Sequence, residues 1–162
     1  MRRAALLGNP NVGKTTLFNI LTGSNQYVGN WAGVTVEKKS GVFEDSVEIV
    51  DLPGIYAMDT YSNEETVSKE FLINGDVDII LNIVDASNLS RNLYLTMQLK
   101  EFKKPMILLL NMADTLSEKG IKIDYERLQK ELKIKVIPIS ASKGIGIDEV
   151  KTVLREQFNC PV

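Results

Sequence analysis

The sequence predicts an α/β domain whose mainly parallel, six-stranded sheet is flanked by helices. The chain has 162 residues and is 44% hydrophobic, which is enough for one compact domain with a complete core. Short apolar runs recur along it and alternate with longer amphipathic segments. Most of these runs are nearly continuous, a pattern typical of strands that helices cover on both faces of a sheet.

Each expected strand follows from a short apolar run. Five runs are rich in Val, Ile and Leu, at residues 4–7, 47–50, 79–84, 106–110 and 136–139. Residues 41–43 form a shorter run, which we expect at the edge of the sheet. Helices are expected between the runs, at residues 14–21, 64–73, 91–102, 125–132 and 147–158.

The ends of these helices and the loops between them also carry signals. Asn63 and Asp124 are predicted N-caps, and Gly23 follows the first helix where a left-handed terminator is common. Residues 26–33 and 52–63 are predicted as loops. Both loops adjoin motifs that contact phosphate, so we expect them to move.

Composition excludes several classes of function. The net charge of -2 and the lack of a Lys/Arg-dense run argue against nucleic acid as the primary ligand. The chain has no histidine, so its metal sites must use oxygen ligands, which suit Mg²⁺. Cys160 is the single cysteine and weakly favours a reducing compartment. No apolar stretch is long enough to span a bilayer, and the N-terminal apolar run is too short for a signal peptide.

Residues 8–15 read GNPNVGKT and match the phosphate-binding loop pattern of glycine, four residues, then Gly-Lys-Thr. They lie between an expected strand and an expected helix, as that pattern requires. Gly13 lets the backbone approach the phosphates, and consecutive N–H groups at the helix N-terminus face the anion. Lys14 is expected to reach the β- and γ-phosphates, and the Thr15 hydroxyl to ligate Mg²⁺.

Two further motifs concern the metal and the γ-phosphate. Asp51, in the segment DLPG, ends an expected strand where ligands of open α/β sheets gather, and it can hold Mg²⁺ through a water. Gly54 can offer its N–H to the γ-phosphate, although Asp-x-Pro-Gly is equally often an ordinary turn. Thr35, in the segment GVTV, can add a second hydroxyl to Mg²⁺. A lone loop threonine is usually just solvated, so this assignment depends on the other motifs.

The last two motifs concern the base. Asp114, in the segment NMAD, offers two acceptor oxygens that match the N1–H and 2-amino donors of guanine, which adenine does not present. Asn111 can bond the N7 side of the base and brace the phosphate loop. The Ala141 N–H, in the segment SAS, can donate to guanine O6, a weak signal by itself.

Together these five motifs indicate a Ras-like P-loop GTPase fold that binds GTP and, with Mg²⁺, hydrolyses it to GDP. The predicted Mg²⁺ ligands are Thr15, Thr35 and Asp51. The predicted nucleotide-binding residues are Gly8, Asn9, Pro10, Asn11, Val12, Gly13, Lys14, Thr15, Thr16, Gly33, Val34, Thr35, Asp51, Gly54, Asn111, Met112, Asp114, Ser140, Ala141 and Ser142.

Beyond these motifs, the sequence resembles the cytosolic G domain of the bacterial ferrous-iron transporter B family (FeoB). The resemblance covers nearly the whole chain and rests on GNPNVGKTTLFN, GNWAGVTVEKKSG, DLPGIYAMDTYSNEE, NMAD and ISASKGIG. One departure is Ala32, where the family usually has proline before Gly33, so this loop is expected to be more mobile.

The resemblance implies a cation-assisted mechanism. Ile55 stands where Ras-like proteins place the glutamine that orients the attacking water. In the family, K⁺ bridges the phosphates, held by the asparagine matching Asn11 and by carbonyls matching Gly29 and Trp31. A cation there offsets the charge that develops during phosphoryl transfer. The predicted catalytic set is Lys14, Asn11, Thr35 and Gly54.

The resemblance also implies a setting. Residues 1–158 would form the G domain, and residues 159–162 would begin a linker to a helical domain and a membrane region that moves Fe²⁺. The expected partners are these parts of the same protein, with a second copy of the chain as a further candidate and no nucleic acid. The expected location is the cytoplasmic face of the bacterial inner membrane, with this chain itself soluble.

Two features leave alternatives open. Trp31 is as suited to packing against the domain as to contacting a partner. Asp59, Glu64, Glu65 and Glu70 are better explained as a solvated helix face than as an iron site.

At the level of function there are two alternative classes. One is a ribosome-assembly or tRNA-modification GTPase, against which the net charge and the GNWAGVTVE block count. The other is a GTP/GDP sensor with slow hydrolysis, which Ile55 and the lack of an evident catalytic base favour.

Overall fold

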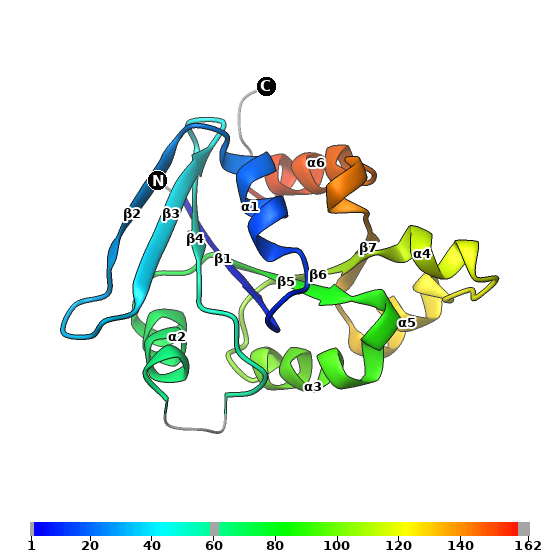
Figure 1. Ribbon diagram of the computed structural model, residues 1–162, viewed down its shortest axis with the longest axis horizontal. Helices are drawn as coiled ribbons and strands as arrows, with labels where there is room; N and C mark the ends of the chain where they lie inside the picture. The colour runs from blue at the N-terminus through cyan, green and yellow to red at the C-terminus, as the bar shows by residue number, and fades with distance from the viewer. Residues whose placement is uncertain (1, 59–61, 159–162) are drawn as a thin grey trace.

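The computed structural model describes residues 2–58 and 62–158, which form one sheet with helices on both faces (Figure 1). The strand order is β2-β3-β4-β1-β5-β6-β7. Strands β1, β4, β5, β6 and β7 pair in parallel, and β3 is antiparallel to both of its neighbours. The predicted α/β class with a mainly parallel sheet is confirmed. The strands are β1 (Arg2–Gly8), β2 (Gln26–Asn30), β3 (Glu37–Phe43), β4 (Val47–Asp51), β5 (Ile79–Asp85), β6 (Met106–Asn111) and β7 (Lys135–Pro138).

The described residues contain seven strands, where the sequence predicted six. The additional strand, β2, lies in the segment that was predicted as a loop. The sequence did not indicate this strand, because its residues are mostly exposed and show no apolar periodicity. Its pairing with β3 also corrects the position of residues 41–43. They belong to a longer strand that lies between β2 and β4, and β2 is the edge of the sheet.

The five predicted helices are present, and a sixth, α4, was not predicted. Asp124 caps α5 as expected, since its side chain accepts a hydrogen bond from the Arg127 N–H. The predicted cap Asn63 is wrong: Ser62 is the N-cap of α2 and forms a capping box with Glu65. The helices are α1 (Lys14–Thr22), α2 (Asn63–Asn74), α3 (Leu89–Lys100), α4 (Ala113–Glu118), α5 (Tyr125–Leu132) and α6 (Ile147–Phe158), with short 3₁₀ turns η1 (Ala86–Asn88) and η2 (Ala141–Lys143).

Apolar side chains on the two faces of the sheet form separate cores. On one face, α1 and α6 pack over strands β1, β4, β5, β6 and β7 through residues such as Phe18 and Val150. On the other face, α2 and α3 cover β1, β4 and β5 through residues such as Leu72 and Leu95. Strands β1, β5 and β6 therefore contribute buried residues to both faces, as their continuous apolar sequences require.

The parallel strands place the predicted motifs at one edge of the sheet. The loops that leave the carboxyl ends of β1, β4, β6 and β7 begin after Gly8, Asp51, Asn111 and Pro138. Strand register aligns these ends, because Leu6 lies beside Asp51 and Leu110 lies beside Pro138. This edge is where ligands of open α/β sheets bind.

No helix in the described parts of the chain has both the length and the apolar character needed to cross a bilayer.

Candidate nucleotide-binding site

The loop between β1 and α1 has the backbone shape of a phosphate-binding loop. Asn11 and Gly13 both have positive φ, at 65° and 92°. A Cβ atom on Gly13 would lie 2.2 Å from Nδ2 of Asn111, so the loop tolerates no side chain there. The N-terminus of α1 faces a cavity of about 590 Å³ lined by Asn9, Pro10, Asn11, Gly13, Lys14, Thr15, Thr16, Gly54 and Met112.

Asn111 connects the phosphate loop to the last motif. Its buried side chain donates from Nδ2 to the Val12 carbonyl at 2.8 Å and accepts at Oδ1 from the Ala141 N–H at 2.9 Å. The expected brace on the phosphate loop is therefore present. The Ala141 N–H, expected to donate to guanine O6, is engaged by Asn111 in this structure. Contact with a base would require this hydrogen bond to be shared or broken.

Asp114 projects from the first turn of α4 beside a lysine that sequence reasoning did not assign to the site. The Lys143 Nζ lies 2.6 Å from an Asp114 carboxylate oxygen and 3.6 Å from one of Glu118. The hydrogen bond and charge of Lys143 hold the pKa of Asp114 below its usual range, and Asp114 raises the pKa of Lys143. Lys143 directly follows the SAS segment, a position that offered the signal to find it. The carboxylate that we expect at the base is thus ionised and ion-paired.

Lys14 contacts Asp51, one of the residues expected at the metal. Its ammonium group hydrogen-bonds to Oδ1 of Asp51 and to the Leu52 carbonyl. Both side chains are largely buried, with 13% and 8% of their area exposed. The positively charged ammonium group of Lys14 therefore lies against two oxygen atoms, one from the Asp51 carboxylate and one from the Leu52 carbonyl.

The segment after β4 packs closely on the phosphate loop. A Cβ on Gly54 would lie 3.3 Å from Cα of Pro10, and the Ile55 N–H donates to the Gly8 carbonyl at 3.2 Å. The Ile55 side chain is buried in the core of the α2/α3 face. No polar side chain stands at position 55 to orient a water molecule, as the sequence indicated.

The three predicted Mg²⁺ ligands line two adjoining cavities, both of which Lys14 also lines. Asp51 and Thr35 line a cavity of about 280 Å³ together with Lys14 and Glu64. Thr15 lines the larger cavity at the phosphate loop. Glu64 is exposed at the start of α2, as expected of a solvated helix face, and it also lines this cavity, a position that the sequence alone does not fix.

The structure does not bring the predicted K⁺ ligands together. Asn11 lies in the phosphate loop, whereas Gly29 pairs with Lys38 in the β2–β3 hairpin. Figure 1 shows the connection between β2 and β3 at the far end of this hairpin, well away from the loop between β1 and α1. Assembly of that site would require residues 29–36, including Gly33 and Val34, to move toward the phosphate loop.

Trp31 packs against the domain. Its ring makes an edge contact with Phe71 of α2, with centroids 5.3 Å apart and an interplanar angle of 68°. The Lys38 ammonium lies 4.8 Å from the centre of the indole. The packing alternative therefore describes Trp31 in this structure.

The acidic stretch divides into residues with different surroundings. Glu65 is buried in the capping box of α2, whereas Glu64 and Glu70 are exposed. Asp59 lies outside the described residues, as do Cys160 and the expected linker at 159–162. Within residues 2–58 and 62–158, no three Asp, Glu, Cys or His side chains are grouped as a metal site.

These features define the class of protein. A parallel sheet with a phosphate-binding loop after β1, an aspartate after β4 and base-recognition motifs after β6 and β7 is a Ras-like P-loop G domain. The chain belongs to the ferrous iron transport protein B family, whose model matches residues 2–154. This match decides against a ribosome-assembly or tRNA-modification GTPase.

Relatives in sequence agree with this family. The chain is 51% identical to the Fe(2+) transporter FeoB of Staphylococcus aureus (strain COL) over 147 residues, which is 90% of this chain and 22% of the relative. It is 49% identical to that of Escherichia coli (strain K12) over 156 residues, or 92% of this chain and 20% of the relative. The chain thus spans about a fifth of the length of these transporters.

Solved structures agree as well. A GDP-bound variant of the S. thermophilus FeoB G-domain is 49% identical and superimposes with a TM-score of 0.93, covering 100% of this chain and 63% of that one. The cytosolic domain of the T. maritima FeoB iron transporter in its GMPPNP form is 43% identical with a TM-score of 0.91, covering 96% and 63%.

Proposed function

We propose that this domain binds GTP and GDP, hydrolyses GTP with Mg²⁺, and serves as the nucleotide switch of a ferrous iron transport protein. One observation carries the proposal: buried Asn111 joins the phosphate loop at Val12 to the base motif at Ala141. This arrangement would hold the phosphate cradle close to the motifs that would recognise the base. Relatives with 43–49% identity are GDP-bound or in a GMPPNP form, which supports a guanine nucleotide as the ligand.

Binding would exchange the ion pairs of the free site for contacts with the nucleotide. The phosphates would lie at the N-terminus of α1, where free N–H groups and the helix dipole favour anions. Lys14 would turn from Asp51 to the β- and γ-phosphates. At the other end, Asp114 would accept from the N1–H and 2-amino groups of guanine, leaving Lys143 to rearrange.

The side chains around the position that Lys14 would leave fit Mg²⁺. The carboxylate of Asp51 already accepts an ammonium group, and hydroxyl and carboxylate oxygens are the donors that Mg²⁺ prefers. Thr15, Thr35 and Asp51 would hold the ion, Asp51 through a water. When bound, Mg²⁺ offsets the negative charge of the β- and γ-phosphates during transfer.

Hydrolysis needs an attacking water in line with the γ-phosphate, and Ile55 cannot orient it. We infer that backbone groups near Gly54 would do so, and that Asn11, Gly29 and Trp31 would hold a K⁺ ion whose charge would stand in for an arginine finger. The β2–β3 connection must then move to the phosphate loop when GTP binds. This movement of the β2–β3 connection on GTP binding would be the switch signal.

The rest of the protein would receive this signal. We place the domain at the cytoplasmic face of the inner membrane, joined to helical and transmembrane parts that carry Fe²⁺. Two solved relatives are named as cytosolic domains of FeoB proteins, which supports this placement. A second copy of the chain is a further candidate partner.

The hydrolysis rate in KCl and in NaCl at matched ionic strength tests the reaction. We expect strong stimulation by K⁺ in the wild type and its loss in Asn11→Ala, because the carboxamide would be a K⁺ ligand. Persistent stimulation in the variant would remove Asn11 from the K⁺ site. Equal slow rates in both salts would instead favour a GTP/GDP sensor, which the buried apolar Ile55 also suits.

The base preference is tested separately by Asp114→Asn. The amide presents a donor where guanine requires an acceptor, so we expect about a hundredfold loss of GDP affinity and a gain for xanthosine diphosphate. Glu118→Gln is the matched control, because Glu118 also contacts Lys143 and lies one turn further along α4. Unchanged guanine selectivity in Asp114→Asn would place the base pocket elsewhere.

A further inference from the structure

The segment that follows Gly54 is held by α3 at two points. The Arg91 guanidinium lies over the Tyr56 ring, with Cζ 4.8 Å from its centre. The Met58 N–H donates to the Gln98 side-chain oxygen at 2.7 Å. Arg91 and Gln98 are seven residues apart, about two helical turns, so both project from one face of α3. Figure 1 shows the chain that leaves β4 running down toward α3 before it turns to α2.

The position of this segment matters because Ile55 has no polar side chain to orient a water molecule. Ile55 is 4% exposed, and its N–H is already used by the Gly8 carbonyl. The groups left to orient an attacking water are the backbone groups around it. Their placement depends on what fixes residues 54–56, which have no regular secondary structure.

Arg91 also lines a cavity beside the phosphate loop. It lines a polar cavity of about 80 Å³ with Asn9, Asn11, Tyr56 and Asp85, among others. The Asn9 side-chain oxygen is buried there without a hydrogen-bond partner in the described part of the chain. Arg91 therefore borders a cavity that also touches the loop that would hold the phosphates and the segment that would present the water.

We propose that Arg91 is a positioning residue for GTP hydrolysis. Through the ring of Tyr56 it holds residues 54–56 against the phosphate loop, so that their backbone orients the attacking water. The inference rests on the proposed hydrolytic function. Tyr56 is 51% exposed, so this cation–π contact adds little to global stability but fixes the conformation of an irregular segment.

The test compares Arg91→Ala, Arg91→Lys, Tyr56→Ala and Tyr56→Phe in single-turnover GTP hydrolysis with Mg²⁺ and K⁺. Affinities for GDP and GMPPNP and thermal midpoints are measured alongside. The matched control is Arg127→Ala, because Arg127 pairs with Glu131 on the exposed surface of α5.

We expect both alanine variants to lower the hydrolysis rate about tenfold with GDP affinity and thermal midpoint unchanged. Tyr56→Phe keeps the aromatic face and Arg91→Lys keeps the cation, so both should retain most of the rate. The double variant Arg91→Ala/Tyr56→Ala should be no slower than either single one, because both remove the same contact.

Different failures are distinguishable. A wild type that binds GDP without hydrolysing GTP overturns the proposed function and, with it, this inference. A wild type that hydrolyses GTP while Arg91→Ala matches Arg127→Ala overturns the inference alone. Additive losses in the double variant, or equal losses of rate and GDP affinity, would likewise show that Arg91 does not act through Tyr56.

Discussion

The phosphate loop and the β2–β3 hairpin are both expected to contact the nucleotide, yet the structure fixes them very differently. Buried Asn111 and the tight backbone at Gly13 hold the phosphate loop. The hairpin includes the edge strand β2, in which Tyr27 and Val28 are 67% and 66% exposed. Its far end rests on α2 through Trp31, whose indole nitrogen is buried without a hydrogen-bond partner in the described residues.

This difference suits a switch. The loop that would bind the phosphates of both GTP and GDP is preorganised, so it gives affinity in either state. The hairpin end is weakly docked, and an unsatisfied buried N–H costs about 1–3 kcal/mol, which offsets part of the packing of Trp31. Regions of low local stability are those that can rearrange when a ligand contacts them.

The largest expected effect comes from breaking the fixed region. Asn111→Ala would leave the Val12 carbonyl and the Ala141 N–H buried and unpaired, at a cost of about 3 kcal/mol in the free energy of unfolding. We expect GDP affinity to fall about a hundredfold, since the cradle and base motif lose their connection. Denaturant unfolding and titration with fluorescent GDP measure both quantities. Exposed Asn74→Ala is the control, and unchanged GDP affinity in Asn111→Ala would contradict the brace.

A smaller effect is expected at the mobile region. Trp31 is the single tryptophan, so its fluorescence reports the hairpin end directly. GMPPNP with Mg²⁺ should shift its emission to longer wavelength as it leaves Phe71, whereas GDP should not. Phe71→Leu should show the shifted emission before ligand is added, at a stability cost of about 1 kcal/mol. Binding of GMPPNP with no change in emission would mean that Trp31 stays docked.

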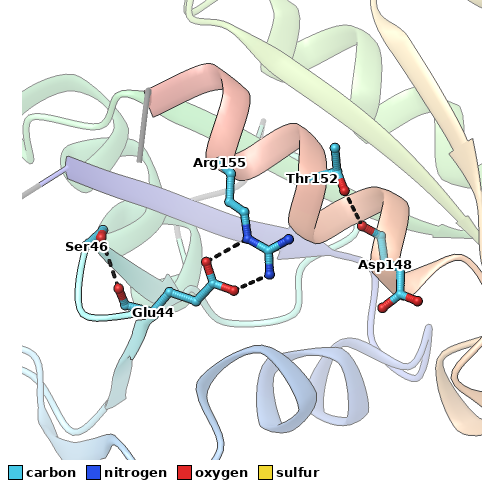
Figure 2. Close-up of polar contacts among 5 residues, drawn as sticks. All are labelled: Glu44, Ser46, Asp148, Thr152 and Arg155. Carbon is cyan, nitrogen blue, oxygen red and sulfur yellow. Dashed lines mark hydrogen bonds and ion pairs between the residues drawn. The ribbon is translucent and has the colours of Figure 1, made fainter. Parts of the chain in front are cut away.

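The smallest effect concerns the turn that follows β3, at the end of the hairpin opposite Trp31. Figure 2 shows Arg155 of α6 pairing through two nitrogens with Glu44, in the turn between β3 and β4. The hydrogen bond to Arg155 holds the pKa of Glu44 below its ordinary value of 4.5. The pair therefore stabilises the fold above that pH, and this contribution is lost as the pH falls through the lowered pKa.

We expect less than about 1 kcal/mol from the pair, because about a third of each side chain is exposed and solvent screens the charges. Glu44→Gln should lower stability at neutral pH and match the wild type only once the pH has fallen through the lowered pKa of Glu44, which lies below 4.5. Unfolding free energies across this range measure the difference. A constant difference at all pH values would show that the pair contributes by packing rather than by charge.

Much of the fixed region could be predicted from sequence. Its strands are continuous apolar runs, and its motifs consist of neighbouring residues whose spacing sets their geometry. The sequence predicted that Asn111 braces the phosphate loop, and the parallel strands bring the ends of β1 and β6 to the same side of the sheet. Asp124 was recognised as a cap because capping depends on adjacent residues.

The sequence by itself determined the α/β class, the order of the nucleotide motifs and the family resemblance, because these depend on local periodicity and spacing. Tertiary structure decided that residues 26–30 form an edge strand, that Lys14 rests on Asp51, and that Lys143 pairs with Asp114. It also decided that Gly29 lies in the β2–β3 hairpin and that Trp31 packs on Phe71 of α2, whereas Asn11 lies in the phosphate loop. Each of these depends on strand pairing or on charges that meet across the fold, and local spacing alone does not fix such contacts, even where a neighbouring motif points to the residue, as it does for Lys143.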